Sequence, residues 1–251
     1  MTRVEEIRRA EAMAHDEMYK CGENVYAWLK KPVKVVADLL TEFDGYEQLR
    51  VLDLGCGIGR NIWLILQRFK DIDCQIDAVD SLESAIKGLM ERAKELGVGG
   101  YVKPILGFVD EYVIGENSYD LILAISILEH VANKEIFTQK LFELRDGMRR
   151  GGIVCLVMNS DVEEVDLETG KNLEPQFEVK LRGSEVVSEC ENIFVGWEVL
   201  QRNISAQRYI TPRKGGKVGL RTKVVTFVAR KVDMNAKAIN LGQGLRSDRS
   251  A

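Results

Sequence analysis

Residues 51–61 read VLDLGCGIGRN, a short apolar run that ends in three alternating glycines. The apolar run has the length of a β-strand, and glycines directly after a strand allow a tight turn into a helix. In an open parallel sheet, ligands bind where the first strand turns into the first helix. The stretch therefore predicts a ligand site in which the backbone at Gly55, Gly57 and Gly59 approaches the ligand closely.

The spacing of these glycines indicates what kind of ligand the turn binds. A dinucleotide-binding turn requires G-x-G-x-x-G, whose third glycine lets the helix pack closely. Arg60 stands where that third glycine would fall, and Asp53 just before the turn would repel a pyrophosphate. A carboxylate here suits a ligand with positive charge, and S-adenosylmethionine carries both a sulfonium and an ammonium group.

The order of the predicted elements indicates an α/β fold. From about residue 50, apolar runs of strand length alternate with segments of helical period, which is typical of a largely parallel sheet. The predicted strands are 51–54, 75–79, 102–108, 121–126 and 153–158. The predicted helices are 60–69, a helix that runs to about residue 96, and one with the apolar stripe Phe137, Leu141, Leu144 and Met148 that stops at Gly151 and Gly152.

Charge separates the last third of the chain into two parts. Residues 161–191 hold ten acidic and three basic residues and include a predicted helix, 184–191, whereas residues 199–232 hold nine basic residues and no acidic one. The runs 198–204 and 223–229, separated by a turn with Pro212 and two glycines, predict an antiparallel hairpin that closes one edge of the sheet. Its basic residues either form an electropositive rim that attracts a small anion, or protect a solvated edge from pairing with another strand.

Composition limits the remaining possibilities. The net charge is -4, and no apolar run is long enough to span a bilayer. The mixed charges of the first ten residues do not form a secretory signal, so we expect a soluble, cytoplasmic protein. Five dispersed cysteines and two histidines predict no metal site and no disulfide framework. We expect a helical cap over residues 1–30, one domain over 31–232 and a flexible tail over 233–251.

Several of these motifs together resemble the class I S-adenosylmethionine-dependent methyltransferases. VLDLGCGIG is similar to the first motif of that class, AVDS at 78–81 to the second, FVDEY at 108–112 to the segment that contacts adenine, and SYDLILAISILEHV at 118–131 to the fourth strand and its loop. The resemblance implies a Rossmann-like, doubly wound sheet of seven strands, mostly parallel, with the C-terminal antiparallel hairpin strand.

The resemblance also implies a cofactor site for S-adenosyl-L-methionine, with S-adenosyl-L-homocysteine as the product. In it, Asp80 would accept hydrogen bonds from both ribose hydroxyls, although the same carboxylate would also serve as a simple helix cap. Cys56 would contribute its backbone in the turn, or its thiol to a soft ligand. The implied cofactor-binding residues are Asp53, Gly55, Cys56, Gly57, Gly59, Asn61, Asp80, Ser81, Val109, Asp110 and Ile125.

The expected reaction is transfer of a methyl group to a small-molecule acceptor. GCGIGRN, GWEVL at 196–200 and the closing LRTKVVTFVARK are similar to the tellurite-resistance methyltransferases, which implies a soft nucleophile such as a thiol or a selenium or tellurium oxyanion. His130 is the candidate general base, since it follows the fourth strand and titrates near neutrality, unless it only caps or packs the next helix. The alternatives are an RNA-modifying methyltransferase and a cofactor-binding module without turnover.

Overall fold

The computed structural model describes residues 2–20, 31–213 and 216–232, and an eight-stranded sheet forms its centre. The strand order is β3-β2-β1-β4-β5-β8-β7, with β6 beside β5. The strands are β1 Gln48–Leu54, β2 Asp73–Asp80, β3 Val102–Leu106, β4 Tyr119–Ile125, β5 Met148–Asp166, β6 Asn172–Leu173, β7 Glu198–Arg213 and β8 Gly216–Arg230. The helices are α1 Arg3–Lys20, α2 Lys34–Leu39, α3 Ile62–Arg68, α4 Glu83–Glu95, α5 Lys134–Gly147 and α6 Gly183–Ile193, with short 3-10 turns η2 Leu40–Phe43, η3 Gly99–Tyr101 and η4 Leu128–His130.

The predicted fold class is confirmed, with a corrected number of strands. Strands β1 to β5 pair in parallel, and β8 and β7 follow as an antiparallel hairpin at one edge. The sheet has eight strands and not seven, because two residues of the acidic segment, Asn172 and Leu173, pair with the end of β5. So short a strand has no apolar alternation by which the sequence could reveal it.

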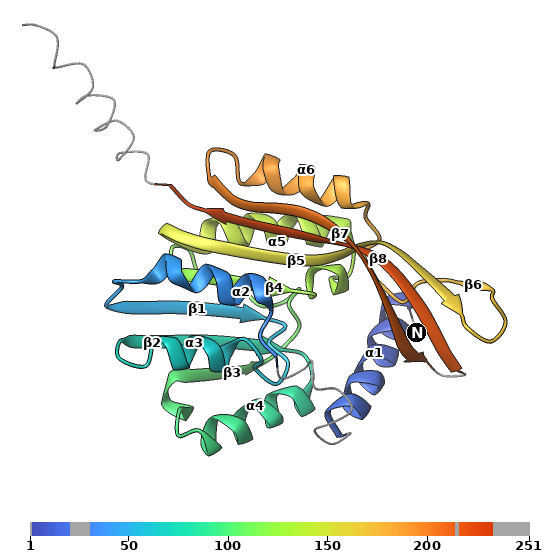
Figure 1. Cartoon of the computed structure of the whole chain (residues 1–251), viewed down its shortest axis with the longest axis horizontal. Coiled ribbons are helices and arrows are strands. Elements are labelled where there is room, and N and C mark those ends of the chain that lie inside the picture. Colours follow the sequence, from blue (N-terminus) through green and yellow to red (C-terminus); the bar gives the residue numbers. More distant parts are fainter. Residues whose placement is uncertain (1, 21–30, 214–215, 233–251) are drawn as a thin grey trace, which may run out of the picture.

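The parallel strands fix where a ligand can bind. β1 lies between β2 and β4, so the chain first builds the sheet toward β3 and then returns to the other side of β1 (Figure 1). This reversal is the topological switch point of the sheet, where the carboxyl ends of neighbouring strands leave a crevice. The turn after Leu54 therefore lies at the place that the sequence predicts.

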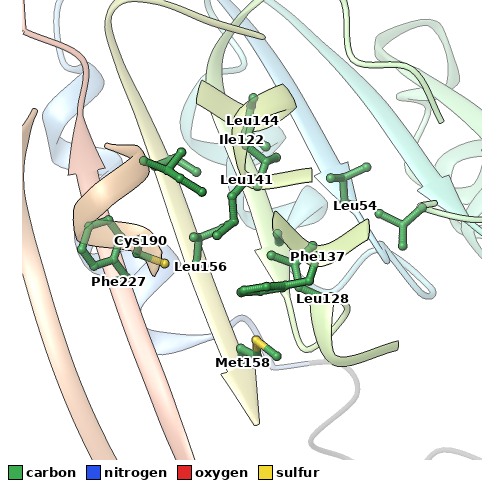
Figure 2. Packing of buried hydrophobic residues seen from close by; sticks show 14 of the residues in the cluster. Leu54, Ile122, Leu128, Phe137, Leu141, Leu144, Leu156, Met158, Cys190 and Phe227 are labelled. Atoms are coloured by element: carbon green, nitrogen blue, oxygen red, sulfur yellow. The ribbon is translucent and has the colours of Figure 1, made fainter. Parts of the chain in front are cut away.

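Two hydrophobic clusters hold helices on the two faces of the sheet. Leu52 and Leu54 of β1 belong to the cluster that contains α5 and α6, whereas Val51 belongs to the cluster that contains α2, α3 and α4. This alternation follows from the two-residue period of a strand, and it leaves both faces covered. Figure 2 shows Phe137 and Leu141 of α5 packed beside the strands of the first cluster.

Strand β5 is much longer than the predicted 153–158. It covers 19 residues, and only its part up to Val157 pairs with β4. Residues 158–166 continue beyond β4 and pair with β8, which pairs with β7 along its whole length (Figure 1). We give the name arm to residues 158–166 of β5, together with residues 218–225 of β8 and residues 204–211 of β7, which pair beside them. The prediction ended the strand at the start of the acidic segment, but strand pairing continues through it.

Two further boundaries differ from their predictions. The helix with the apolar stripe ends at Gly147, and Met148 opens β5, although its side chain is fully buried as expected. Pro212 does not lie in the hairpin turn: it is paired with Lys217 near the tip of β7. Because β7 is an edge strand, a proline without an N–H group is tolerated there. The expected tail over 233–251 lies outside the described residues, as does the 21–30 part of the expected cap.

The core gives a direct test of this packing. Phe137 is fully buried, whereas Phe142, on the same helix, is 42% exposed. Phe137→Ala is expected to lower the free energy of unfolding by about 3 to 5 kcal/mol, because it removes a buried ring and leaves a cavity. Phe142→Ala, the matched control, is expected to change it by less than about 1 kcal/mol. Urea unfolding followed by circular dichroism measures both, and equal losses would contradict the assigned packing.

Candidate functional site

The glycine turn is held by the end of the neighbouring strand. Gly55, Gly57 and Gly59 have φ angles of +68°, +53° and +86°, a region that side chains other than glycine rarely adopt. The N–H of Gly57 donates to Oδ2 of Asp80 over 2.8 Å, and the N–H groups of Gly55 and Cys56 donate to the carbonyl of Val79. The turn is therefore fixed to the carboxyl end of β2 before any ligand binds.

Packing explains two of the three glycines. A Cβ at Gly55 would lie 2.8 Å from Cβ of Ile127, and one at Gly59 would lie 2.7 Å from Leu89 and 2.8 Å from Trp63. These are contacts with the protein itself, so the bare backbone at both positions admits neighbouring side chains. This adds a structural reason to the predicted one, which was close approach to a ligand.

Asp53 is buried beside this turn with one oxygen that has no hydrogen bond. The residue is 1% exposed, and Oδ2 lacks a hydrogen-bond partner among the described residues. Burial raises the pKa of Asp53 to about 7, against the opposing effect of the Arg60 guanidinium, and the carboxylate of Asp80 adds to the rise. A buried carboxyl group with an unused oxygen is costly unless a donor or cation reaches it, which makes Asp53 the best placed group to hold an ammonium.

Asp80 joins the two turns at this edge and does not cap α4. Its Oδ1 accepts from the N–H of Leu82 over 3.0 Å, but the residue before α4 is Leu82 itself, and no side chain caps the helix there. Burial raises the pKa of Asp80, while its hydrogen bonds from Leu82 and Gly57 oppose the rise. Each carboxylate oxygen keeps a second lone pair, so the group still has acceptor capacity for hydroxyls.

The other predicted cofactor residues differ in solvent exposure and in hydrogen bonding. Ser81 is exposed, and Val109 and Ile125 are buried at the ends of their segments. Asn61 is 3% exposed, and its Oδ1 accepts from the N–H of Val33, which ties the segment before α2 to the turn. Burial raises the pKa of the Cys56 thiol, so this thiol stays protonated, which favours the backbone role for Cys56.

Helix α1 crosses over this edge and binds Asp110. Nη2 of Arg8 lies 2.6 Å from Oδ2 of Asp110, and its guanidinium lies 4.7 Å from the centre of the Phe108 ring. The N–H of Ala132 donates to the same Asp110 oxygen over 3.0 Å. Farther along α1, Asp16 accepts from the hydroxyl of Ser84 on α4. Helix α1 therefore covers residues 3–20 of the expected 1–30 cap, and its Arg8 contacts the predicted adenine segment.

His130 is held in a pair with Glu178. Nδ1 of the ring lies 3.0 Å from Oε2 of Glu178, and the ring stacks on Phe177 with centroids 5.2 Å apart. Burial of the ring favours its neutral form and lowers the pKa of His130. The hydrogen bond with Glu178, together with the carboxylates of Glu129 and Glu11, outweighs burial and raises the pKa to about 9. The raised pKa makes the ring a poor proton acceptor at pH 7, although a carboxylate at Nδ1 is also how a histidine base is oriented, so the general-base role of His130 stays a prediction.

Glu129 connects His130 to the arm. Its side chain is fully buried, Oε1 accepts from the side-chain amide of Asn159 over 2.6 Å, and Oε2 has no hydrogen-bond partner among the described residues. Thr222 of β8 in turn donates to Oδ1 of Asn159 over 3.3 Å. Gln207 and Tyr209 of β7 lie on the same face of the arm as Thr222, by the register of the pairs Gln207↔Thr222 and Tyr209↔Leu220. The face of the arm that carries Thr222, Gln207 and Tyr209 therefore lies beside Glu129.

Sequence reasoning missed three of these residues, and it also missed the strained backbone of Ser126 after β4. Arg8 and Glu178 lie more than 40 residues from His130 in the chain. In the sequence each is one charged residue among others, so nothing distinguishes it from its neighbours. Glu129 stands beside the chosen histidine but gives no sign of its burial. Ser126 has a φ of +54°, which is strained for a residue with a side chain, and its position directly after β4 is the only signal that it gives.

The described residues contain no group of three or more histidine, cysteine, aspartate or glutamate side chains that could hold a metal ion. None of the described helices is both long and apolar enough to cross a membrane. Cys56, Cys74, Cys155 and Cys190 are buried and free.

Comparisons with known proteins agree with this geometry. A family model described as a methyltransferase domain matches residues 51–152. The probable (S)-tetrahydroprotoberberine N-methyltransferase 2 of Papaver bracteatum is 32% identical over 91 residues, which cover 36% of this chain and 24% of that protein. The ubiquinone biosynthesis O-methyltransferase of Rickettsia felis is 26% identical over 140 residues, 54% of each chain. A geranyl diphosphate methyltransferase solved with S-adenosylmethionine has a TM-score of 0.54 at 14% identity and covers 79% of this chain and 84% of its own.

These matches show which proteins this chain resembles. The segment from β1 to the start of β5 is similar to methyltransferase domains, and the sheet has the fold of the solved methyltransferase. The chain spans about half or less of the length of these two curated relatives, one of which methylates nitrogen and the other oxygen by name.

The packing of the turn can be separated from its backbone strain. Gly55 and Gly97 have nearly equal φ angles, +68° and +69°, but a Cβ at Gly97 would have no atom within 4 Å. Gly97→Ala is expected to cost about 1 to 2 kcal/mol of the free energy of unfolding, from the backbone alone. Gly55→Ala is expected to cost about 1 to 3 kcal/mol more, because of the contact with Ile127. Chemical unfolding of the two variants measures the difference, and equal costs would show that Ile127 does not confine the turn.

Proposed function

We propose that this protein transfers a methyl group from S-adenosylmethionine to a small-molecule acceptor. The observation that carries the proposal is Oδ2 of Asp53, a buried carboxyl oxygen without a hydrogen bond beside the glycine turn. An anionic pyrophosphate would repel the buried carboxylate and raise the free-energy cost of its charge, whereas an ammonium would stabilise that charge. The residues present therefore fit a cofactor with a cationic amino-acid tail.

In this proposal each group at the edge of the sheet has one task. Asp53 holds the ammonium, and Asp80 accepts from the ribose hydroxyls while it keeps the turn in place. Val109, Asp110 and Ile125 border the adenosine, together with Ser81. The cofactor supplies an electrophilic methyl group on its sulfonium, and proximity and orientation of the acceptor can contribute roughly 7 to 11 kcal/mol to the reaction.

The protonation state of His130 limits which kind of acceptor the site can serve. Because the pKa of His130 is about 9, the ring is charged at neutral pH and is a poor proton acceptor. An acceptor atom that is already nucleophilic and carries no proton at pH 7 needs no base, and a thiolate or a selenium or tellurium oxyanion meets this condition. We therefore propose a soft or anionic nucleophile. Glu129 and the face of the arm with Thr222, Gln207 and Tyr209 would border it.

Binding and turnover test the two parts of this proposal. Isothermal titration with S-adenosylhomocysteine is expected to show a single site, and absence of binding would end the proposal. Radiolabelled S-adenosylmethionine offered with a thiol, selenite, tellurite, an amine, a carboxylate and RNA is expected to label the soft or anionic small acceptors. Binding without labelling of any of them would favour a cofactor-binding module without turnover.

The pKa of Asp53 predicts how binding depends on pH. Because the pKa of Asp53 in the folded protein is about 7, the carboxylate charge appears as the pH rises through 7. Affinity for S-adenosylhomocysteine is therefore expected to increase from pH 6 to pH 8. Asp53→Asn is expected to remove this dependence and to weaken binding at pH 8 by about 1.5 to 3 kcal/mol, the range for a hydrogen bond to a charged group.

Asp120 supplies the matched control for this measurement. It is also buried, but it lies at the amino end of β4, where it accepts from the N–H of Arg50 and pairs with Arg149. Asp120→Asn is expected to lower stability and to leave the pH dependence of binding intact. An unchanged pH profile in Asp53→Asn would remove Asp53 from the cofactor site.

A further inference from the structure

The segment between β6 and α6 holds the His130 ring on two sides. Oε2 of Glu178 lies 3.0 Å from Nδ1, and Phe177 stacks on the ring at an interplanar angle of 23°. The backbone joins the two loops as well, since the N–H of Val179 donates to the carbonyl of Glu129 over 3.0 Å. The ring is therefore restrained on one face and at one nitrogen. Its second nitrogen, Nε2, takes no part in this hydrogen bond.

Helix α1 restrains the other oxygen of the same carboxylate. The side chain of Glu178 is 1% exposed, and Nε of Arg8 lies 3.6 Å from its Oε1. Arg8 is itself fixed by Asp110, 2.6 Å away, and Nη2 also reaches the carbonyl of His130 over 3.4 Å. Oε1 accepts no hydrogen bond among the described residues, so Arg8 acts on this carboxylate through its charge, whereas the hydrogen bond at Oε2 joins it to the ring.

Charged groups face His130 from every neighbouring element. Those on the same loop and the segment after β6 are Glu129 and Glu178, and those on α1 are Glu11 and Arg8, with Asp110 behind Arg8. The carboxylates outnumber the single guanidinium, and Glu178 is the one in hydrogen-bond contact with the ring. Glu178 is therefore the group whose charge acts most directly on His130.

We propose that Glu178 is a positioning residue: its carboxylate holds the His130 ring at Nδ1, so that Nε2 is left to face an anionic acceptor. The inference rests on the proposed function for its acceptor, but not for the pairing itself, which is a property of the protein without ligands. His130 then stabilises negative charge on the acceptor and orients it toward the methyl group, and it takes up no proton. The substrate class that fits is a small oxyanion or thiolate.

Proton NMR tests the pairing directly, because the chain has two histidines. The His15→Gln variant assigns the imidazole signals, and titration of the full chain without cofactor gives the pKa of each ring. Wild-type His130 is expected to titrate near 9, and Glu178→Gln is expected to move it toward the ordinary value of 6.5. Glutamine keeps an acceptor at the same place but removes the charge, so the change reports charge and not the loss of a contact.

Glu174→Gln is the control, since Glu174 lies on the same segment but is exposed and pairs with Arg3 and Lys180. It is expected to leave the titration of His130 unchanged. If Glu178→Gln does not fold, the wild-type titration still decides, since a wild-type pKa near 6.5 overturns the proposal. A wild-type value near 9 that persists in Glu178→Gln also overturns it, because another group would then hold the charge.

Sodium selenite serves as the probe for the anionic acceptor. In the presence of S-adenosylhomocysteine, millimolar selenite is expected to shift the His130 signal of the wild type and to have little effect on that of Glu178→Gln. A wild-type His130 signal that does not respond overturns the assignment of His130 to an anionic acceptor. Failure of S-adenosylhomocysteine to bind would instead count against the proposed function, and the titration without ligand would keep its meaning.

Discussion

The hydrogen bond from the N–H of Gly57 to Asp80 connects the two strand ends on which the site depends. β1 and β2 are parallel neighbours, so both end at the same edge, and this 2.8 Å bond fixes the distance between their turns. The positive φ of Gly57 aims its N–H at the carboxylate, which a residue with a side chain could do only under strain. Asp53, one residue before the turn, is buried as a consequence of the same geometry.

The sequence predicted the parallel half of the sheet well, because its strands are buried on both faces. Such strands appear as continuous apolar runs bounded by turns, and the runs beginning at Val51 and Leu121 lie within β1 and β4. The arm was predicted less well. Four of the residues 161–166 are acidic and most of the segment is partly exposed, and β8 offers it strand partners from more than 50 residues farther along the chain.

The candidate site divides in the same way. The half around the glycine turn was predictable, because Asp53, the glycines and Asp80 lie at the ends of strands whose order fixes their place. The acceptor half was not, because Arg8, Glu129 and Glu178 meet only after three distant segments have folded against one another. The prediction of His130 as a base followed from the ordinary pKa of histidine, and a carboxylate 48 residues away changes that pKa.

The arm leaves the domain at the point where β4 ends, and from there on it is built without the parallel strands. Its residues pair only with one another and with β6, while the glycine turn depends on β1 and β2. The arm is thus a separate module of the fold: its side chains can be exchanged while the glycine turn between β1 and β2 stays as it is.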